Sequence, residues 1–363
     1  MIRRLLILTL ALSVSLSLAA CGDNTEEKSS ESKTVYLLSW GGTIQTMLEK
    51  DGWAKRFKED TGYTVRLVPK ATSSEIMAAA ALQKSDPKVD LVMADFAAWI
   101  RGIDQDLFAK IDESSVPNLK HVYDTARIER DGALYGVFPY IDIVGVMYNK
   151  EEFEKNNWEP FKTWDDLLRP ELAGTIIMPP PDNTYGMYAL IQFAKMNGGS
   201  QTEIDPGFEF YKRLAPSIFS TSTTFAQIGT LIDRGEAAVA VFGNGSAAEL
   251  NNRDIPVEFV LPDPAYMSPT AMGIVKNGPN PQGAEVFLNW WLSPEVLGER
   301  ASTYFQTPMI DNVEIETEAL ESLILDLSEI EQLESIDYEA AAEARSNWVK
   351  RYQKEIAPLI REN

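Results

Sequence analysis

The feature that most constrains the fold is the alternation of short apolar runs with helical stretches that starts at Thr34. The predicted elements are, in chain order, strand 35–38, helix 47–61, strand 63–68, helix 73–84 and strand 89–93. The second helix begins with a Ser/Thr cap. Strands that alternate with helices in this way predict a parallel sheet with helices on its faces.

The same alternation returns further along the chain with different residues. The predicted elements are strand 141–148, a helix starting at 164–168, strand 175–178, helices 187–196 and 225–234, strands 237–242, 256–261 and 271–275, and helix 281–292. The tail, 314–361, has strong helical propensity, and Trp348, Tyr352 and Ile356 give its last helix an apolar stripe. The globular part has about 330 residues, enough for two α/β domains with separate cores.

The N-terminus predicts export. Arg3 and Arg4 precede an apolar run, 5–18, that is too short to span a bilayer comfortably, and small residues follow it. Residues 1–20 therefore form a predicted signal peptide. The Leu18-Ala19-Ala20-Cys21 sequence resembles the bacterial lipobox, which implies lipidation of Cys21; the alternative is a free cysteine after an ordinary cleavage site. Residues 21–33 are small and polar, as in a flexible tether that links the lipid anchor to the folded part.

Composition narrows the classes of function and partner. Cys21 is the one cysteine, so an intrachain disulfide is excluded, and no later apolar run reaches the length of a membrane span. A net charge of −21 argues against nucleic acid and anionic lipid headgroups as partners. His121 has no second histidine or cysteine near it in the sequence, so we expect neither a metal site nor a cofactor.

Several motifs occur in an order that resembles the type II periplasmic binding proteins of ABC importers, in the branch that includes spermidine and putrescine receptors. The motifs are Ser39-Trp40-Gly41-Gly42-Thr43, the segment 132–149, Thr163-Trp164-Asp165-Asp166-Leu167-Leu168 followed by 170–174, Phe242-Gly243-Asn244-Gly245-Ser246-Ala247, and the closing segments 291–296, 307–308 and 348–358. The resemblance covers nearly all of the chain after the tether.

The resemblance implies a two-lobed α/β fold, each lobe a mainly parallel sheet flanked by helices, with a ligand cleft between the lobes. The implied crossovers lie near 138–146 and 262–272. Lobe 1 is then 34–140 plus 268–312, lobe 2 is 141–267, and C-terminal helices in 313–363 pack on a lobe. We expect a monomer, lipid-anchored in the periplasm or at the cell surface, that delivers a small solute to a membrane permease.

Loops at the carboxyl ends of strands are where open parallel sheets bind ligands. Together with the implied crossovers, this rule selects the predicted ligand-binding residues Ser39, Trp40, Thr43, Thr72, Ser73, Asp95, Phe96, Tyr140, Asp142, Thr184, Tyr185, Asn244, Tyr266 and Ser268. The same loops contain Lys70, Asp182, Asn183 and Asp263. Trp40, Phe96 and Tyr185 have core packing as their alternative role.

Aromatic rings and carboxylates together favour an organic cation, through cation–π attraction and charge-assisted hydrogen bonds. We therefore expect a polyamine or another small organic amine. Lys70 and Arg101 are expected to be the only basic groups near the loops. The chain departs from the polyamine receptors at Gly243, where they tend to have tryptophan, and at Ser268 or Pro269, where they tend to have an acidic residue. A small anion such as a phosphonate or carboxylate is the alternative ligand.

Binding without chemistry is the expected function. A secreted hydrolase would use a nucleophile-elbow serine, a metal cluster or a histidine base, and one histidine with one lipidated cysteine leaves only carboxylate-pair chemistry for that alternative. A sensory lipoprotein that presents its liganded form to a membrane receptor is the third possibility. The sequence favours a receptor that closes over its solute about a hinge.

Overall fold

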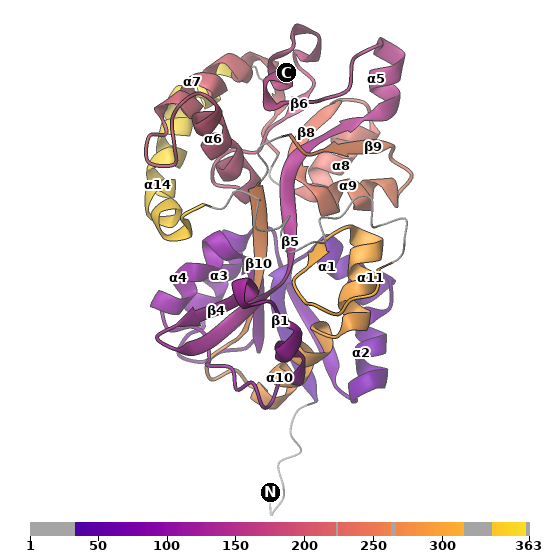
Figure 1. Cartoon of the computed structure of the whole chain (residues 1–363), viewed down its shortest axis with the longest axis vertical. Helices are drawn as coiled ribbons and strands as arrows, with labels where there is room; N and C mark the ends of the chain where they lie inside the picture. The colour runs from indigo at the N-terminus through magenta and orange to yellow at the C-terminus, as the bar shows by residue number, and fades with distance from the viewer. Residues whose placement is uncertain (1–32, 223, 263–265, 316–335, 361–363) are drawn as a thin grey trace, which may run out of the picture. The chain divides into compact units, whose positions relative to one another are not determined.

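Two groups of parallel strands, joined by two long crossover strands, organise the protein (Figure 1). The computed structural model describes residues 33–222, 224–262, 266–315 and 336–360. Its strands are β1 (Thr34–Trp40), β2 (Thr64–Lys70), β3 (Leu91–Asp95), β4 (Arg127–Arg130), β5 (Ala133–Asn149), β6 (Ile176–Ile177), β7 (Ile218–Ser220), β8 (Val239–Gly243), β9 (Val257–Val260), β10 (Tyr266–Ile274) and β11 (Thr307–Pro308).

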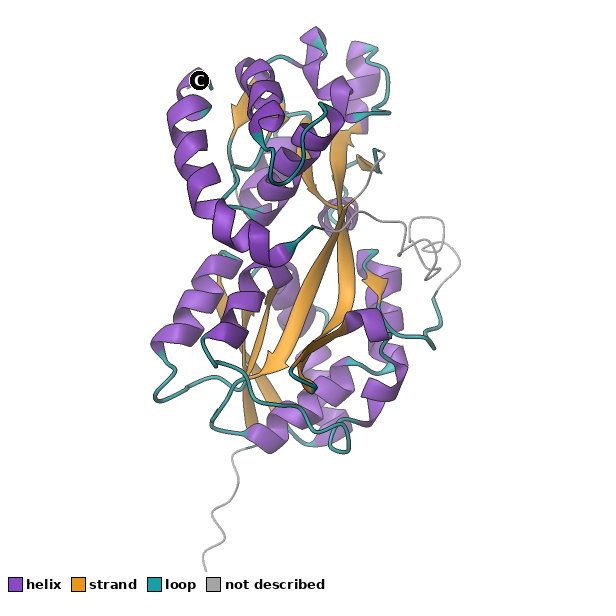
Figure 2. Cartoon of the chain, turned by 60° about the vertical axis from the view of Figure 1, so that its left-hand side comes forward, coloured by secondary structure: helices purple, strands orange, loops and turns teal. Residues whose placement is uncertain are grey.

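Helices lie on both sides of the strands (Figure 2). They are α1 (Thr43–Gln45), α2 (Trp53–Thr61), α3 (Ser73–Leu82), α4 (Phe96–Asp104), α5 (Lys150–Asn156), α6 (Thr184–Met196), α7 (Asp205–Leu214), α8 (Phe225–Asp233), α9 (Asn244–Asn251), α10 (Pro281–Trp291), α11 (Pro294–Tyr304) and α14 (Tyr338–Glu355). A π-helix, η1 (Thr46–Lys50), follows α1, and the 3-10 turns are η2 (Pro117–His121), η3 (Asp124–Ala126), η4 (Trp164–Leu168), η5 (Pro170–Leu172), η6 (Ala215–Ser217) and η7 (Ala357–Leu359). Among the described residues, no helix combines the length and apolar character needed to cross a membrane.

The strand order is β2-β1-β3-β10-β5-β8-β6-β7. The predicted parallel pairing is confirmed in both groups: β1 is parallel to β2 and β3, and β6 is parallel to β7 and β8. We call the part built on β2-β1-β3 lobe 1 and the part built on β7-β6-β8 lobe 2. The crossover strands β5 and β10 are antiparallel to their neighbours and to each other. They carry the chain from one lobe to the other.

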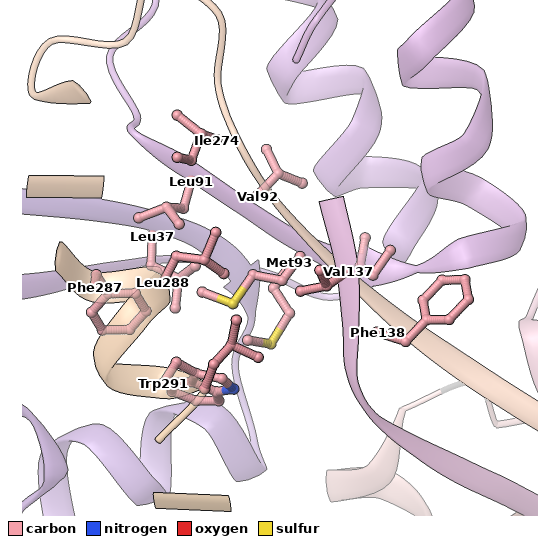
Figure 3. Close-up of a cluster of buried hydrophobic side chains, with 14 of the residues drawn as sticks. Leu37, Leu91, Val92, Met93, Val137, Phe138, Ile274, Phe287, Leu288 and Trp291 are labelled. Atoms are coloured by element: carbon pink, nitrogen blue, oxygen red, sulfur yellow. The ribbon is translucent and has the colours of Figure 1, made fainter. Parts of the chain in front are cut away.

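Each lobe has its own buried core. In lobe 1, Leu37 and Leu91 on the parallel strands meet Phe287, Leu288 and Trp291 of α10, all fully buried (Figure 3). In lobe 2, the corresponding cluster is formed by α6, α7 and the strands they cover. Burial of one such side chain contributes about 1.5–3 kcal/mol, so each core can hold its lobe together without a disulfide.

The last helix, α14, packs its predicted apolar stripe on lobe 2. Trp348, Tyr352 and Ile356 are all buried there, which confirms the stripe. The same helix also contacts lobe 1, because Tyr338 packs edge-on against Phe96 of α4 with ring centroids 4.9 Å apart. The helix thus contacts both lobes.

Two predicted elements differ in ways that have a local cause. The helix predicted over 47–61 is interrupted, because Gly52 adopts a left-handed conformation (φ 84°) and α2 starts only at Trp53. The segment after Asp95, predicted as a loop, is helical from Phe96 onward. The cap predicted for α3 is confirmed: the Thr72 side chain accepts a hydrogen bond from the Glu75 backbone amide.

Candidate functional site

A cavity of about 380 Å³ lies where the strands of both lobes end. This volume is in the range of pockets that bind small molecules. Its lining is Trp40, Gly41, Gly42, Thr43, Ile44, Lys70, Ala71, Thr72, Ser73, Ser74 and Asp95 from lobe 1, Tyr140, Asp142 and Thr270 from the crossover strands, Asp182, Asn183, Thr184, Tyr185, Thr224, Phe225, Ala226, Phe242, Gly245 and Ser246 from lobe 2, and Arg300, Gln306 and Arg345 from the C-terminal part. Both lobes and both crossovers therefore contribute to one cavity.

Most of the predicted ligand-binding residues meet at this cavity. Those that line it are Trp40, Thr43, Thr72, Ser73, Asp95, Tyr140, Asp142, Thr184 and Tyr185. They come together because the parallel strands of each lobe end at the same edge of the sheet. Asp263, named with the same loops, and Cys21, the predicted lipidation site, lie outside the described residues.

Asp95, the last residue of β3, accepts hydrogen bonds from both lobes. The Ser73 hydroxyl of lobe 1 donates to Asp95 Oδ2 at 2.5 Å, and the Thr184 hydroxyl of lobe 2 donates to the same oxygen at 2.8 Å. Burial raises the pKa of Asp95, although these two hydrogen bonds and the charge of Arg345 oppose the shift. Oδ1 has no hydrogen-bond partner among the described residues, so a ligand donor can use it.

Trp40 is held beside this carboxylate. Its indole nitrogen donates to Ser73 Oγ at 3.1 Å, and the Ser73 hydroxyl in turn donates a hydrogen bond to Asp95 Oδ2. The ring, at the end of β1, lines the cavity, and a ring of this kind attracts a cation placed over its face. Trp40 and Asp95 thus form one wall suited to an organic cation.

Asp142 lies on β5 where it crosses between the lobes. The Gln306 amide donates to Asp142 Oδ1 at 2.6 Å, and Gly245 donates from its backbone. Burial raises the pKa of Asp142 to about 6, against the opposing effects of Gln306 and Arg300. A Cβ atom on Gly245 would lie 3.0 Å from Asp142 Oδ1, so the glycine leaves room for this close approach. Gln306 Oε1 has no partner among the described residues.

Tyr185 accounts for one departure from the polyamine receptors. Its ring packs on Phe242 with centroids 4.1 Å apart, and a Cβ atom on Gly243 would lie 2.7 Å from its hydroxyl oxygen. A tryptophan at position 243 would need the space that Tyr185 occupies. The aromatic group at this point of the cavity therefore comes from α6 and not from the strand end.

Two arginines that the sequence analysis did not select line the cavity. The expectation that Lys70 and Arg101 are the only basic groups near the loops is therefore wrong. Lys70 does line it, but Arg101 does not, whereas Arg300 of α11 and Arg345 of α14 do. Arg345 donates to the backbone oxygens of Pro181 (3.0 Å) and Asp182 (2.7 Å). The signal for Arg300 was available in its spacing, because it shares the buried face of α11 with Leu297 and Tyr304.

Five predicted residues do not line the cavity. Phe96 packs between Phe138 and Tyr338, at 4.8 and 4.9 Å between centroids, because it belongs to the first turn of α4. Asn244 connects two segments: its Oδ1 accepts from the Ile143 amide at 2.8 Å and its amide nitrogen donates to the Phe305 carbonyl.

The other three lie inside strands. Ser39 is fully buried in β1, Tyr266 is fully buried in β10 with Lys195 5.1 Å from its ring centroid, and Ser268 of β10 is paired with Asp142 of β5 in the antiparallel register. Neither Tyr266 nor Ser268 lies in a loop, because β10 is one long strand over 266–274, where the sequence predicted a strand only from 271.

A second contact connects the lobes at the rim of the cavity. The Thr43 hydroxyl of lobe 1 donates to Glu249 of α9, which is buried and also pairs with Arg253. Arg253 lies 5.0 Å from the ring centroid of Phe225, which also lines the cavity and is not among the predicted ligand-binding residues. Among the described residues, no group of three or more His, Cys, Asp or Glu side chains is placed to hold a metal ion.

Comparison with curated proteins gives relatives of similar length. The spermidine/putrescine-binding periplasmic protein of Salmonella typhimurium is 24% identical over 305 residues, covering 82% of each chain. The putrescine-binding periplasmic protein SpuD of Pseudomonas aeruginosa is 23% identical over 320 residues, covering 82% of this chain and 81% of its own.

Comparison with solved structures gives the same fold. The periplasmic binding protein AfuA of Actinobacillus pleuropneumoniae, solved with fructose-6-phosphate, matches with a TM-score of 0.70 at 20% identity, over 89% of this chain and 98% of its own. This likeness establishes the two-lobed periplasmic-binding-protein fold.

A family model described as bacterial extracellular solute-binding protein matches residues 52–322. That range contains β2 to β11 and every cavity residue except 40–44 and Arg345. The relatives are binding proteins and not enzymes. The chain belongs to the bacterial extracellular solute-binding protein family.

Proposed function

We propose that this protein captures a small polar solute with a protonated amine and delivers it to the permease of an ABC importer. The observation that carries the proposal is Asp95, a carboxylate in the cavity whose Oδ2 accepts hydrogen bonds from Ser73 of lobe 1 and Thr184 of lobe 2. A solute that binds this carboxylate is positioned to contact both lobes.

Electrostatics support an amine at Asp95. Burial raises the pKa of this carboxyl group, so the loss of hydration of its ionised form outweighs the stabilisation by Ser73, Thr184 and Arg345. A ligand ammonium supplies the missing counter-charge at Oδ1, and Trp40 offers its ring face beside it. The curated relatives, a spermidine/putrescine-binding protein and a putrescine-binding protein, support the same class of ligand.

Delivery follows from hinge closure about β5 and β10. A solute with contacts to both lobes stabilises the closed arrangement by its difference in affinity for the closed and open forms, and the permease recognises the closed form. Contacts of the kind made by Thr43 with Glu249 supplement the solute in holding the lobes together.

We also propose that the protein acts as a monomer and is lipid-anchored through Cys21, on the support of its lipobox-like sequence. The proposed division has a signal peptide at 1–20, a tether at 21–33, lobe 1 at 34–140 plus 268–312, lobe 2 at 141–267 and C-terminal helices in 313–363. Of the predicted ligand-binding residues, we retain those that line the cavity and leave out Ser39, Phe96, Asn244, Tyr266 and Ser268.

The ligand class is tested by calorimetry with putrescine, spermidine and amino compounds against uncharged polyols of similar size. We expect an amine to bind with a Kd of about 1 µM, or about −8 kcal/mol, and Trp40→Ala to weaken that binding by about 1–2 kcal/mol. Trp158→Ala, at an aromatic residue outside the cavity, is the matched control and should leave the amine affinity unchanged. Tight binding of a polyol with no binding of any amine would contradict the proposal.

A further inference from the structure

The ionisable side chains that line the cavity sum to zero charge, in a chain whose net charge is −21. Three are acidic and three are basic: Asp95, Asp142 and Asp182 against Lys70, Arg300 and Arg345. A site for a simple polyamine needs an excess of carboxylates, because each ligand ammonium must be compensated when it leaves water. A balanced lining instead suits a ligand that is itself balanced.

Of the buried basic side chains that line the cavity, Arg300 has the fewest protein partners for its hydrogen-bond donors. The side chain is 1% exposed, its Nη1 contacts only the sulfur of Met47, and its Nε has no hydrogen-bond partner among the described residues. It forms no ion pair with a described carboxylate, and the charge of Asp142 acts on it without a direct contact. A buried guanidinium has five donors and is normally paired with an acid, so this arrangement is costly as it stands.

Aromatic rings hold the guanidinium in place without neutralising it. Its central carbon lies 3.8 Å from the ring centroid of Tyr140 and 5.5 and 5.8 Å from those of Trp291 and Tyr304. Stacking of this kind fixes the plane of the group and leaves its hydrogen-bond donors available. The side chain is thus oriented and desolvated, which are the conditions under which a charged hydrogen bond to a ligand is strongest.

Arg345, unlike Arg300, has oxygen acceptors in the protein for its guanidinium donors. Two of its nitrogens donate to the backbone oxygens of Pro181 and Asp182, and the charge of Asp95 acts on it. Lys70, at the end of β2, is only partly buried and keeps access to water. Arg300 is therefore the cation that a ligand can satisfy.

We propose that the solute carries an anionic group, a carboxylate or a phosphonate, that pairs with Arg300, in addition to the amine that pairs with Asp95. The solute is thus a small zwitterion. This inference rests on the proposed function, which supplies the binding site and the amine of the solute. It adds an anionic group to the same solute. It also brings together the two ligand classes, amine and anion, that the sequence left as alternatives.

The first test uses matched compounds on the unaltered protein. Calorimetry compares 4-aminobutyrate with butylamine and butyrate, and 2-aminoethylphosphonate with ethylamine and ethylphosphonate. We expect one zwitterion to bind roughly 10- to 100-fold more tightly than either of its single-charge analogues, as one charged hydrogen-bonded contact predicts. The series in which the zwitterion binds more tightly than its analogues shows whether the anionic group is a carboxylate or a phosphonate.

The second test removes the charge. Arg300→Met keeps the unbranched stem and is expected to reduce zwitterion affinity by roughly 10- to 100-fold, with little effect on the matched amine. Because it removes a buried charge that forms no ion pair with a described carboxylate, the melting temperature of the ligand-free protein should stay the same or rise. Arg300→Lys should restore part of the affinity, and Arg101→Met, at an exposed arginine outside the cavity, is the matched control.

The outcomes separate the inference from the proposed function. Equal affinity for zwitterion and amine, unchanged by Arg300→Met, overturns the zwitterion and leaves the amine-binding function in place. A lower melting temperature of ligand-free Arg300→Met, with equal affinity of the unaltered protein for zwitterion and amine, assigns Arg300 to the fold and also overturns the inference. Binding by none of the six compounds, nor by any polyamine, overturns the inference and the proposed function together.

Discussion

Asp95→Ala is expected to weaken solute binding by about 2–5 kcal/mol, the cost of removing one partner of a buried charge pair. The change removes the counter-charge of the ligand amine and leaves the hydroxyls of Ser73 and Thr184 without their shared acceptor. Since these hydroxyls belong to different lobes, the loss also weakens a contact that connects the lobes. Isothermal calorimetry with the solute found for the unaltered protein measures the effect.

Asp95→Asn separates charge from hydrogen bonding at the same position. The amide oxygen can still accept from Ser73, but it supplies no negative charge, so amine binding should fall by about 1–3 kcal/mol. Asp86→Ala, at an exposed carboxylate paired with Lys88, is the matched control and should leave affinity unchanged. Tighter binding by Asp95→Asn would mean that an anion occupies this place and would end the amine assignment at Asp95.

Cys21→Ser is expected to abolish lipid labelling and to leave the precursor unprocessed, since serine offers no thiol for the lipid. The result is all-or-none, because Cys21 is the one cysteine in the sequence. Labelling of cells with a radioactive or clickable fatty acid, followed by membrane fractionation, measures it. Ser17→Ala, inside the predicted signal peptide, is the control that should mature normally. Efficient maturation of Cys21→Ser, with unchanged membrane association, would remove the lipoprotein assignment.

The parallel parts of the fold and most of the cavity could be predicted because their signals are local. Strand-helix alternation specifies β1, β2 and β3, and residues directly after those strands must meet at one edge of the sheet. Trp40, Ser73 and Asp95 were found by this rule alone, and in the structure hydrogen bonds connect them.

The rest depends on pairing between distant segments. That β10 runs antiparallel between β3 and β5 is a long-range property, and it places Tyr266 and Ser268 inside a strand instead of a loop. Arg300 and Arg345 reach the cavity from helices far along the chain. The spacing of Arg300 with Leu297 and Tyr304 marks it as buried, but it does not mark it as a site residue. Their absence from the sequence-based site made it look more acidic than it is.

Gly243 illustrates how a departure from a family pattern can be compensated elsewhere. The polyamine receptors tend to have tryptophan at this position, but here Tyr185 of α6 occupies the adjacent space against Phe242. The sequence contains both residues, and only the packing of α6 on β8 connects them. Relative to a tryptophan at position 243, Tyr185 adds a hydroxyl group to the lining of the cavity.

Small-angle X-ray scattering with and without solute tests most directly the claim that the protein closes two lobes over its ligand. Hinge closure predicts a smaller radius of gyration at a solute concentration where calorimetry shows saturation, because the ligand stabilises the form in which both lobes contact it. Asp95→Ala at the same solute concentration should keep the larger radius. A radius that stays the same in the unaltered protein at full saturation would contradict capture by hinge closure.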